Sequence, residues 1–93
     1  MADRILSVNA YTTFDLLDGA VEGHGFEETA YTVLNVRTDR EDPDHVELQL
    51  EFDNTDLESV EPHADHVYLS AAQARELAAE LEDHAESVEA SED

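Results

Sequence analysis

Strict alternation of apolar and polar residues marks the segment from about 45 to 53 as the clearest strand of the chain. Apolar side chains recur there at every second residue, at Val46, Leu48, Leu50 and Phe52. Successive side chains of a strand point to opposite faces of a sheet. The pattern therefore predicts a half-buried antiparallel strand with one face in water.

Weaker alternation predicts three further strands, at about 4–16, 29–38 and 66–69. A glycine-bearing loop at 18–26 separates the first two, because glycine supplies turn-capable backbone. The acidic run around Pro43 separates the second and third, since proline cannot donate to a ladder and aspartate suits turns. Connections this short favour a meander, in which each strand pairs with the one before it.

One helix is predicted near the end of the chain, over about 71–88. Ser70 with Gln73 three residues later forms a capping box, which is typical of a helix start. Apolar residues at helical spacing make one stripe: Ala74, Leu77, Ala78, Leu81, Ala85 and Val88. The acidic tail at about 87–93 is expected to fray, because its carboxylates oppose the helix dipole.

These elements predict a single α+β domain over residues 1–93, with the sheet over about 4–69. The sheet is a small antiparallel four-stranded meander, and the C-terminal helix packs on one of its faces. The face that the helix is expected to cover bears Leu6, Val8, Leu34, Leu48, Leu50 and Val67. A chain of this size supports only one core, so a ligand site must lie on the surface or at an interface.

The opposite face of the predicted sheet keeps several aromatic and apolar side chains. They are Tyr11, Tyr31, Val33 and Tyr68. A semi-apolar sheet face without cover is typical of a subunit interface, so these residues predict a homodimer. The alternative is that tyrosine simply tolerates half-exposure on strands.

Charge is the most unusual property of the chain. Its 25 acidic residues face four basic ones, all arginine, which gives a net charge of −21. Such a charge opposes the compact state in dilute buffer, whereas at about 1 M salt the Debye length falls to roughly 3 Å. The composition therefore predicts a cytoplasmic protein of an extreme halophile. A disordered acidic chain and a nucleic-acid mimic are the alternatives, but 41% apolar content in a regular pattern favours a folded domain.

The same charge excludes several classes of function. Four scattered arginines make no basic footprint for nucleic acid, and an acidic surface is repelled by anionic membranes. No apolar run exceeds three residues, so neither a transmembrane helix nor a signal peptide is expected. The absence of cysteine removes thiolate sites, and no serine stands in a nucleophile elbow.

Histidine offers the one chemical constellation in the sequence. A meander places the loop after the first strand and the loop after the third at the same end of the sheet. That end would hold His24, His63, Asp65 and His66, a donor set that suits zinc, nickel or manganese. No other cofactor is indicated. The alternative is that these are solvated surface histidines.

Three segments carry a resemblance to a known family. The opening VNAYTTFDL at 8–16, the middle LQLEFDNT at 48–55 and the close LSAAQARELA at 69–78 resemble a family of short haloarchaeal proteins, over nearly the whole chain. The segment 69–81 is also similar to the closing strand and helix of many small bacterial proteins of unassigned role. The family is described only as a domain of unknown function. The resemblance thus implies habitat and fold, and brings no catalytic residues.

The sequence thus predicts no catalytic residue and no enzymatic activity. It favours a small interaction or regulatory module of a halophile cytoplasm, with a second copy or another protein as partner. The alternative is a metal-binding protein that uses the histidine and aspartate cluster.

Overall fold

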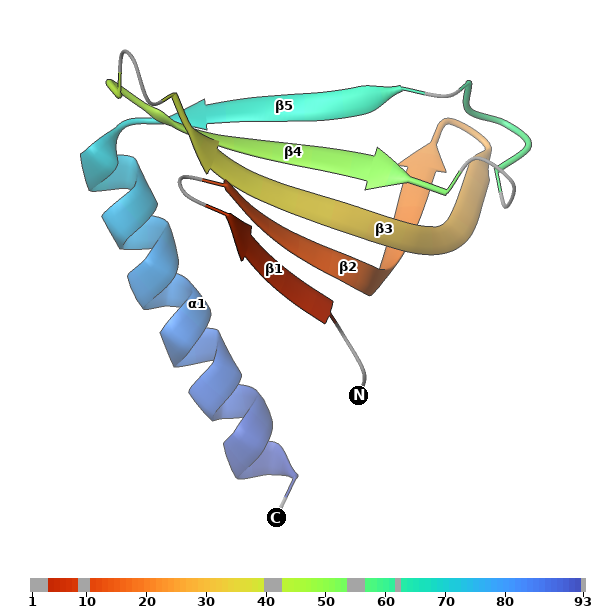
Figure 1. The fold of residues 1–93 in the computed structure, drawn as a ribbon. Coiled ribbons are helices and arrows are strands. Elements are labelled where there is room, and N and C mark those ends of the chain that lie inside the picture. The colour runs from red at the N-terminus through yellow and green to blue at the C-terminus, as the bar shows by residue number, and fades with distance from the viewer. Residues whose placement is uncertain (1–3, 9–10, 40–42, 54–56, 62, 93) are drawn as a thin grey trace.

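Five antiparallel strands lie side by side in chain order, and a single helix follows them (Figure 1). The computed structural model describes residues 4–8, 11–39, 43–53, 57–61 and 63–92, and the side chains from Thr12 onward. The elements are β1 Arg4–Val8, β2 Tyr11–Gly23, β3 Phe26–Thr38, β4 Val46–Phe52, β5 Ala64–Leu69 and α1 Ala71–Ser91. The predicted α+β class, an antiparallel meander followed by a C-terminal helix, is confirmed.

The sheet has five strands because the segment predicted as one first strand forms two, β1 and β2. The predicted loop at 18–26 is also strand, since β2 and β3 pair along this whole stretch and leave only His24 and Gly25 in the turn. Gly25 has a φ of 88°, which glycine adopts at no steric cost. Gly19 is needed for a different reason, because a Cβ there would collide with the hydroxyl of Thr32.

A β-bulge interrupts β2 and bends it sharply, as the orange ribbon shows in Figure 1. Phe14 stands opposite Leu34 and Leu17 opposite Thr32, so two residues of β2 face only Val33 on β3. One of them, Leu16, has a φ of 59°. A bulky side chain in this left-handed region is strained, and its presence marks the bend as a special position.

Pairing across the ladders sorts the described side chains onto two faces. The apolar face consists of Phe14, Leu34, Val36, Leu48, Leu50 and Val67. The polar face consists of Thr13, Asn35, Arg37, Glu47, Gln49, His66 and Tyr68. Leu6 and Val8, predicted on the apolar face, instead share ladder rows with Asn35 and Arg37.

The buried core is small and sits in the middle of β3. Among the described side chains, Ala30, Thr32 and Asn35 are the buried ones, and none is completely enclosed. Asn35 is only 4% exposed and is fully hydrogen-bonded, accepting from the Thr13 hydroxyl at 2.8 Å and donating to Gln49 at 3.0 Å. A buried amide is tolerated because both of its polar ends have partners.

The helix α1 begins as the capping box predicts. The Ser70 hydroxyl accepts from the Gln73 backbone N–H at 3.1 Å, and the Gln73 side chain accepts from the Ser70 N–H at 2.9 Å. The helix extends to Ser91, beyond the end predicted at residue 88.

The predicted packing of the helix on the sheet is wrong. No residue of α1 is buried, and its contacts with the sheet are concentrated on β5. Figure 1 shows the helix leaving the end of β5 and diverging from the strands. Only Ser70 separates β5 from α1, and its two hydrogen bonds fix where the helix starts.

Removal of the cap tests how far α1 depends on it. Ser70→Ala should lower the free energy of unfolding by about 1 kcal/mol, because one helix-terminal N–H loses its acceptor. Denaturant unfolding followed by circular dichroism in about 2 M KCl measures the loss. Ser91→Ala, at the other end of the helix, is the matched control and should change stability by less than about 0.5 kcal/mol. Equal losses in the two variants would contradict the role of the cap.

Replacement of Leu16 tests the strain in the bulge. Leu16→Gly should be more stable than Leu16→Ala by about 1 kcal/mol, because only glycine adopts a positive φ without cost. At the ordinary strand position Ala20 the order should reverse, with Ala20→Gly less stable than the wild type by about 0.5–1 kcal/mol. Thermal unfolding of the four proteins at one salt concentration checks both signs. The same sign at both positions would contradict the strained bulge.

Candidate functional site

Within the described part of the chain, no second layer covers the apolar face of the sheet. Its side chains on β2, β3 and β4 are only half-buried, and Val67 on β5 is exposed. A sheet normally buries one face against a second layer, because its apolar side chains otherwise remain in water. Here the element that should supply this layer, α1, lies elsewhere.

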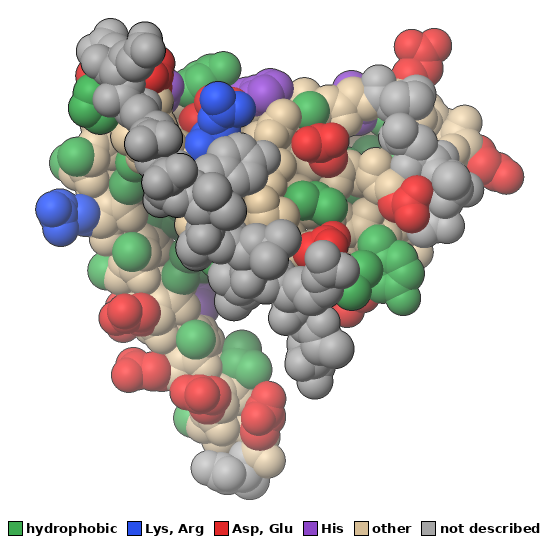
Figure 2. Space-filling model, in the orientation of Figure 1, with side chains coloured by type: hydrophobic (Ala, Val, Ile, Leu, Met, Phe, Trp, Pro, Cys, Tyr) green, Lys and Arg blue, Asp and Glu red, His purple; other side chains and the backbone are tan. Residues whose placement is uncertain are grey.

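The helix carries a second uncovered apolar surface. Its apolar stripe consists of Ala74, Leu77, Ala78, Leu81, Ala85 and Val88. Leu81 is 61% exposed and Val88 57% exposed. Figure 2 shows hydrophobic side chains along the helix, with acidic side chains gathered toward its C-terminal half. A helix that packs on nothing is marginal in water, since most helical stability comes from packing an apolar face.

The overall dimensions confirm that the chain is open. Its accessible surface is 7238 Å², whereas a folded monomer of 10.4 kDa is expected to expose roughly 5,400 Å². The radius of gyration is 15.2 Å, against about 12 Å expected for this length. Both measures indicate surface that a closed domain of this size would bury.

The apolar face is free of charge where β3 pairs with β4. Its four rows there, which are every second row of this ladder, contain no charged residue: Thr32–Phe52, Leu34–Leu50, Val36–Leu48 and Thr38–Val46. The carboxylates of β4, Glu47 and Glu51, belong to the rows between them. Asp65, across from Leu50, places one carboxylate at the β5 edge of the same face. In a chain with 25 acidic residues this separation is the charge depletion typical of an interface core.

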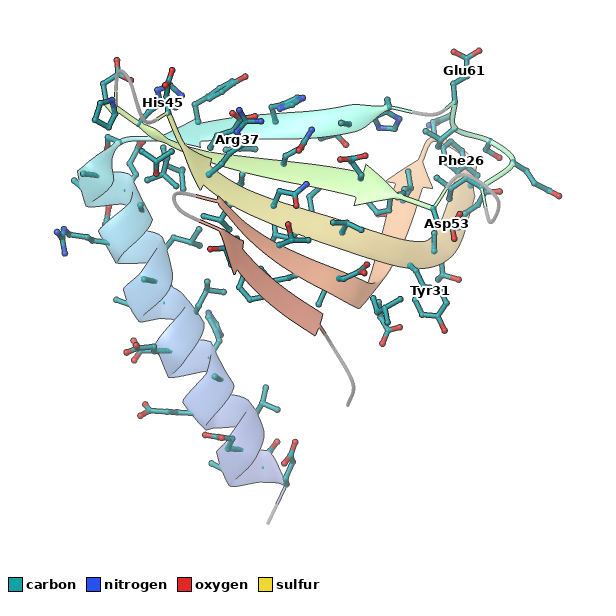
Figure 3. All side chains as sticks on the ribbon, viewed as in Figure 1. Phe26, Tyr31, Arg37, His45, Asp53 and Glu61 are labelled. Carbon is teal, nitrogen blue, oxygen red and sulfur yellow. The ribbon has the colours of Figure 1, made fainter. Side chains whose placement is uncertain are left out.

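The polar face is held together by its own side chains. The Glu47 carboxylate lies 3.6 Å from Nε of Arg37 and 2.6 Å from Nδ1 of His66. Its side chain is only 15% exposed. The Tyr68 ring stacks on His66 and meets the edge of His45. Figure 3 shows Arg37 and His45 gathered at one end of the sheet. These groups pair with one another and stabilise the β3, β4 and β5 ladders.

The residues predicted as the dimer interface belong to the polar face, with Tyr11 and Tyr68 in the row of Glu47 and Val33 in the row of Glu51. Tyr31 and Tyr68 are 57% and 60% exposed, Val33 is half-buried, and the side chain of Tyr11 lies outside the described part of the structure. Tyr31 lies near the middle of β3, well apart from Arg37 (Figure 3), and lines an open depression of about 540 Å³ with Asp18 and Gly19. The polar cluster of Glu47 and its partners adjoins Tyr68.

The predicted metal ligands are not brought together. His24 lies in the β2–β3 turn, and the alternation of β5 places Asp65 and His66 on opposite faces. His66 turns to Glu47, while His63 pairs with Asp65 at 3.2 Å. Across the described part of the chain, no group of three or more metal-ligating side chains stands close enough to hold an ion. The geometry therefore gives the metal hypothesis no support.

His63 still has a perturbed titration. Its pKa is raised above the usual value, chiefly because its Nδ1 donates to the Glu61 carbonyl at 2.8 Å. Partial desolvation opposes this rise, and the Asp65 carboxylate adds to it. A raised folded-state pKa means that the associated stability is present below the unfolded-state pKa and is lost as the pH rises through the folded-state value.

Sequence reasoning missed three features of the site. The bulge had one signal, because the adjacent pair Leu16 and Leu17 breaks the alternation of β2. The divergence of α1 also had a signal in the sequence, since a single residue separates β5 from α1. This spacing shows that the helix starts abruptly but does not show in which direction it points. The pairing of Glu47 with His66 had no signal, because it depends on the register of two strands.

The fold and its surfaces define a class, a small antiparallel meander with an uncovered apolar face and a projecting helix. The chain belongs to a family described as "Family of unknown function (DUF6360)", whose model matches residues 1–90. No curated protein and no solved structure matches the chain. Within the described residues, no helix is long and apolar enough to cross a membrane.

The titration of His63 can be tested directly. Asp65→Asn should lower the pKa of His63 while leaving it above the usual histidine value, because the Glu61 carbonyl remains the main cause of the rise. Imidazole proton shifts followed by NMR from pH 5 to 9 measure the change. Glu58→Gln serves as the control. Glu58 precedes β5 in the same loop as Glu61, and the described hydrogen bonds of His63 go to Glu61 and Asp65 instead. A pKa of His63 that is equal in wild type and Asp65→Asn would contradict the assignment.

Proposed function

We propose that this protein is a non-enzymatic interaction module of a salt-rich cytoplasm. Its working surface is the apolar face of the sheet together with the apolar stripe of α1. The observation that carries this proposal is the exposed area, which exceeds that of a closed monomer by about 1,800 Å². An uncovered apolar surface of this kind is typical of a protein–protein interaction site.

The polar groups support binding rather than catalysis. The densest cluster, formed by Arg37, Glu47 and His66, consists of groups that pair with one another. Asn35, the buried amide, is committed to Thr13 and Gln49. These polar groups link neighbouring strands to one another. The apolar surface makes no comparable contact among the described residues, and we therefore assign the interaction to it.

The charge distribution supports a salt-rich setting and a protein partner. Acidic side chains on the rest of the surface would repel a partner in dilute buffer, but at molar salt the Debye length is about 3 Å and the repulsion is largely screened. The apolar rows of β3 and β4 then meet a partner without burying any charge of their own. Nucleic acid and anionic membranes are not proposed as partners, because a net charge of −21 repels both.

A capture experiment with paired variants tests this function. Tagged protein is used to capture partners from a halophile extract in about 2 M KCl. Leu81→Asp places a charge in the middle of the apolar stripe and should abolish capture, because the charge would have to be buried. Ala79→Asp adds the same charge about 160° away around the helix and should leave capture unchanged.

The measurement is the mass and stoichiometry of each captured chain, the protein's own second copy included. Circular dichroism is the control for folding, and both variants should keep the helix content of the wild type. The proposal fails if wild type captures nothing in stoichiometric amount, or if Leu81→Asp captures as much as Ala79→Asp.

A further inference from the structure

One chain carries two uncovered surfaces that match each other. The sheet has an apolar face without a covering helix, and α1 has an apolar stripe without a sheet. Helices pack on sheets through such surfaces in α+β domains. The chain cannot satisfy both by itself in this structure, because Ser70 directs α1 away from its own strands.

The exposed area matches what a stable dimer requires. The excess over a closed monomer is about 1,800 Å² per chain. Obligate homodimers bury about 2,000–5,000 Å² in total, which is roughly 1,000–2,500 Å² on each copy. A second copy would therefore bury an area within the obligate range, whereas a smaller contact would leave part of either surface in water.

The dimensions of the two surfaces also fit. The 21 residues of α1 extend over about 31 Å. Five strands spaced about 4.8 Å apart make a sheet roughly 19 Å across. One helix is therefore long enough to cross all five strands of another copy.

We infer that two copies form a symmetric homodimer in which α1 of each copy packs its apolar stripe across the apolar face of its partner's sheet. A two-fold axis makes the two helix–sheet contacts identical, so both uncovered surfaces of both chains are covered at once. This inference rests on the proposed function, since it names the occupant of the same surface.

The acidic side chains are placed so that two copies can meet. On the helix, Glu76, Asp83 and Glu86 lie about 140–160° away from Leu81, and Glu80, Glu82 and Glu89 flank the stripe at about 80–100°. The stripe within about 60° of Leu81 in α1 has no carboxylate. On the sheet, the rows of the apolar face between β3 and β4 are free of charge, and Asp65 stands at the β5 edge of that face with an exposed side chain. The contact between the stripe and these rows therefore buries apolar against apolar surface, with the carboxylates at its rim or outside it.

The wild-type protein provides the first test, without any substitution. Sedimentation equilibrium in about 2 M KCl should give about 21 kDa, twice the chain mass of 10.4 kDa. An isotope-filtered NOE experiment on an equal mixture of labelled and unlabelled protein then reports contacts between copies. It should connect methyl groups of Leu77 and Leu81 on one copy with those of Leu48 and Leu50 on the other.

Paired variants provide the second test. Leu81→Asp should raise the dimer dissociation constant by roughly 100-fold or more, because it removes an apolar contact and would bury a carboxylate. Ala79→Asp should change it by less than about 3-fold, since its side chain stays in water.

Each other outcome overturns the inference in a distinct way. A dimer whose NOE contacts join Tyr31 or Tyr68 of the two copies would place the interface on the sheet face predicted from the sequence and refute helix exchange. A monomer that still captures another protein through Leu81 would refute the homodimer and leave the proposed function standing. A monomer without Leu81-dependent capture would refute both.

Discussion

The single residue between β5 and α1 is the constraint on which the rest of the structure depends. Ser70 ends the last strand, caps the helix with its hydroxyl and receives the Gln73 side chain on its own N–H. From this junction α1 diverges from the sheet that precedes it (Figure 1), and none of its residues is buried. The two-layer packing usual in an α+β domain is therefore not made within the chain.

The sheet holds together with little burial because its backbone pairing is continuous. β2 and β3 form one long hairpin, and the polar face adds side-chain links across the ladders, from Thr13 through Asn35 to Gln49 and from Glu47 to Arg37 and His66. Hydrogen bonds of this kind fix register and add only modestly to stability. The apolar contribution that normally dominates folding is incomplete in the isolated chain, since its buried core is so small.

The acidic composition is compatible with such a surface because the charge is segregated. The rows between β3 and β4 on the apolar face and the apolar stripe of α1 have no carboxylate, whereas Asp65 stands at the β5 edge of that face and the glutamates of α1 lie beside or opposite the stripe. Molar salt screens the carboxylates without weakening apolar association, so a salt-rich setting favours contact between two strongly acidic surfaces. In the proposed dimer, the uncovered faces and the net charge are therefore compatible, because salt would support association rather than oppose it.

The sequence by itself determined the elements whose pattern is local. Alternation fixed β4 to within a residue, the capping box fixed the start of α1, and the antiparallel order followed from short connections. The predicted number of strands was wrong because the segment 4–16 contributes to two paired strands, β1 and β2. The predicted loop at 18–26 is strand because β2 and β3 supply each other's backbone hydrogen bonds there. The histidine site failed because the alternation of β5 separates Asp65 from His66. Only the tertiary structure decided where α1 points and which surfaces stay open, since direction across a junction and register between strands depend on contacts between distant residues that no local pattern encodes.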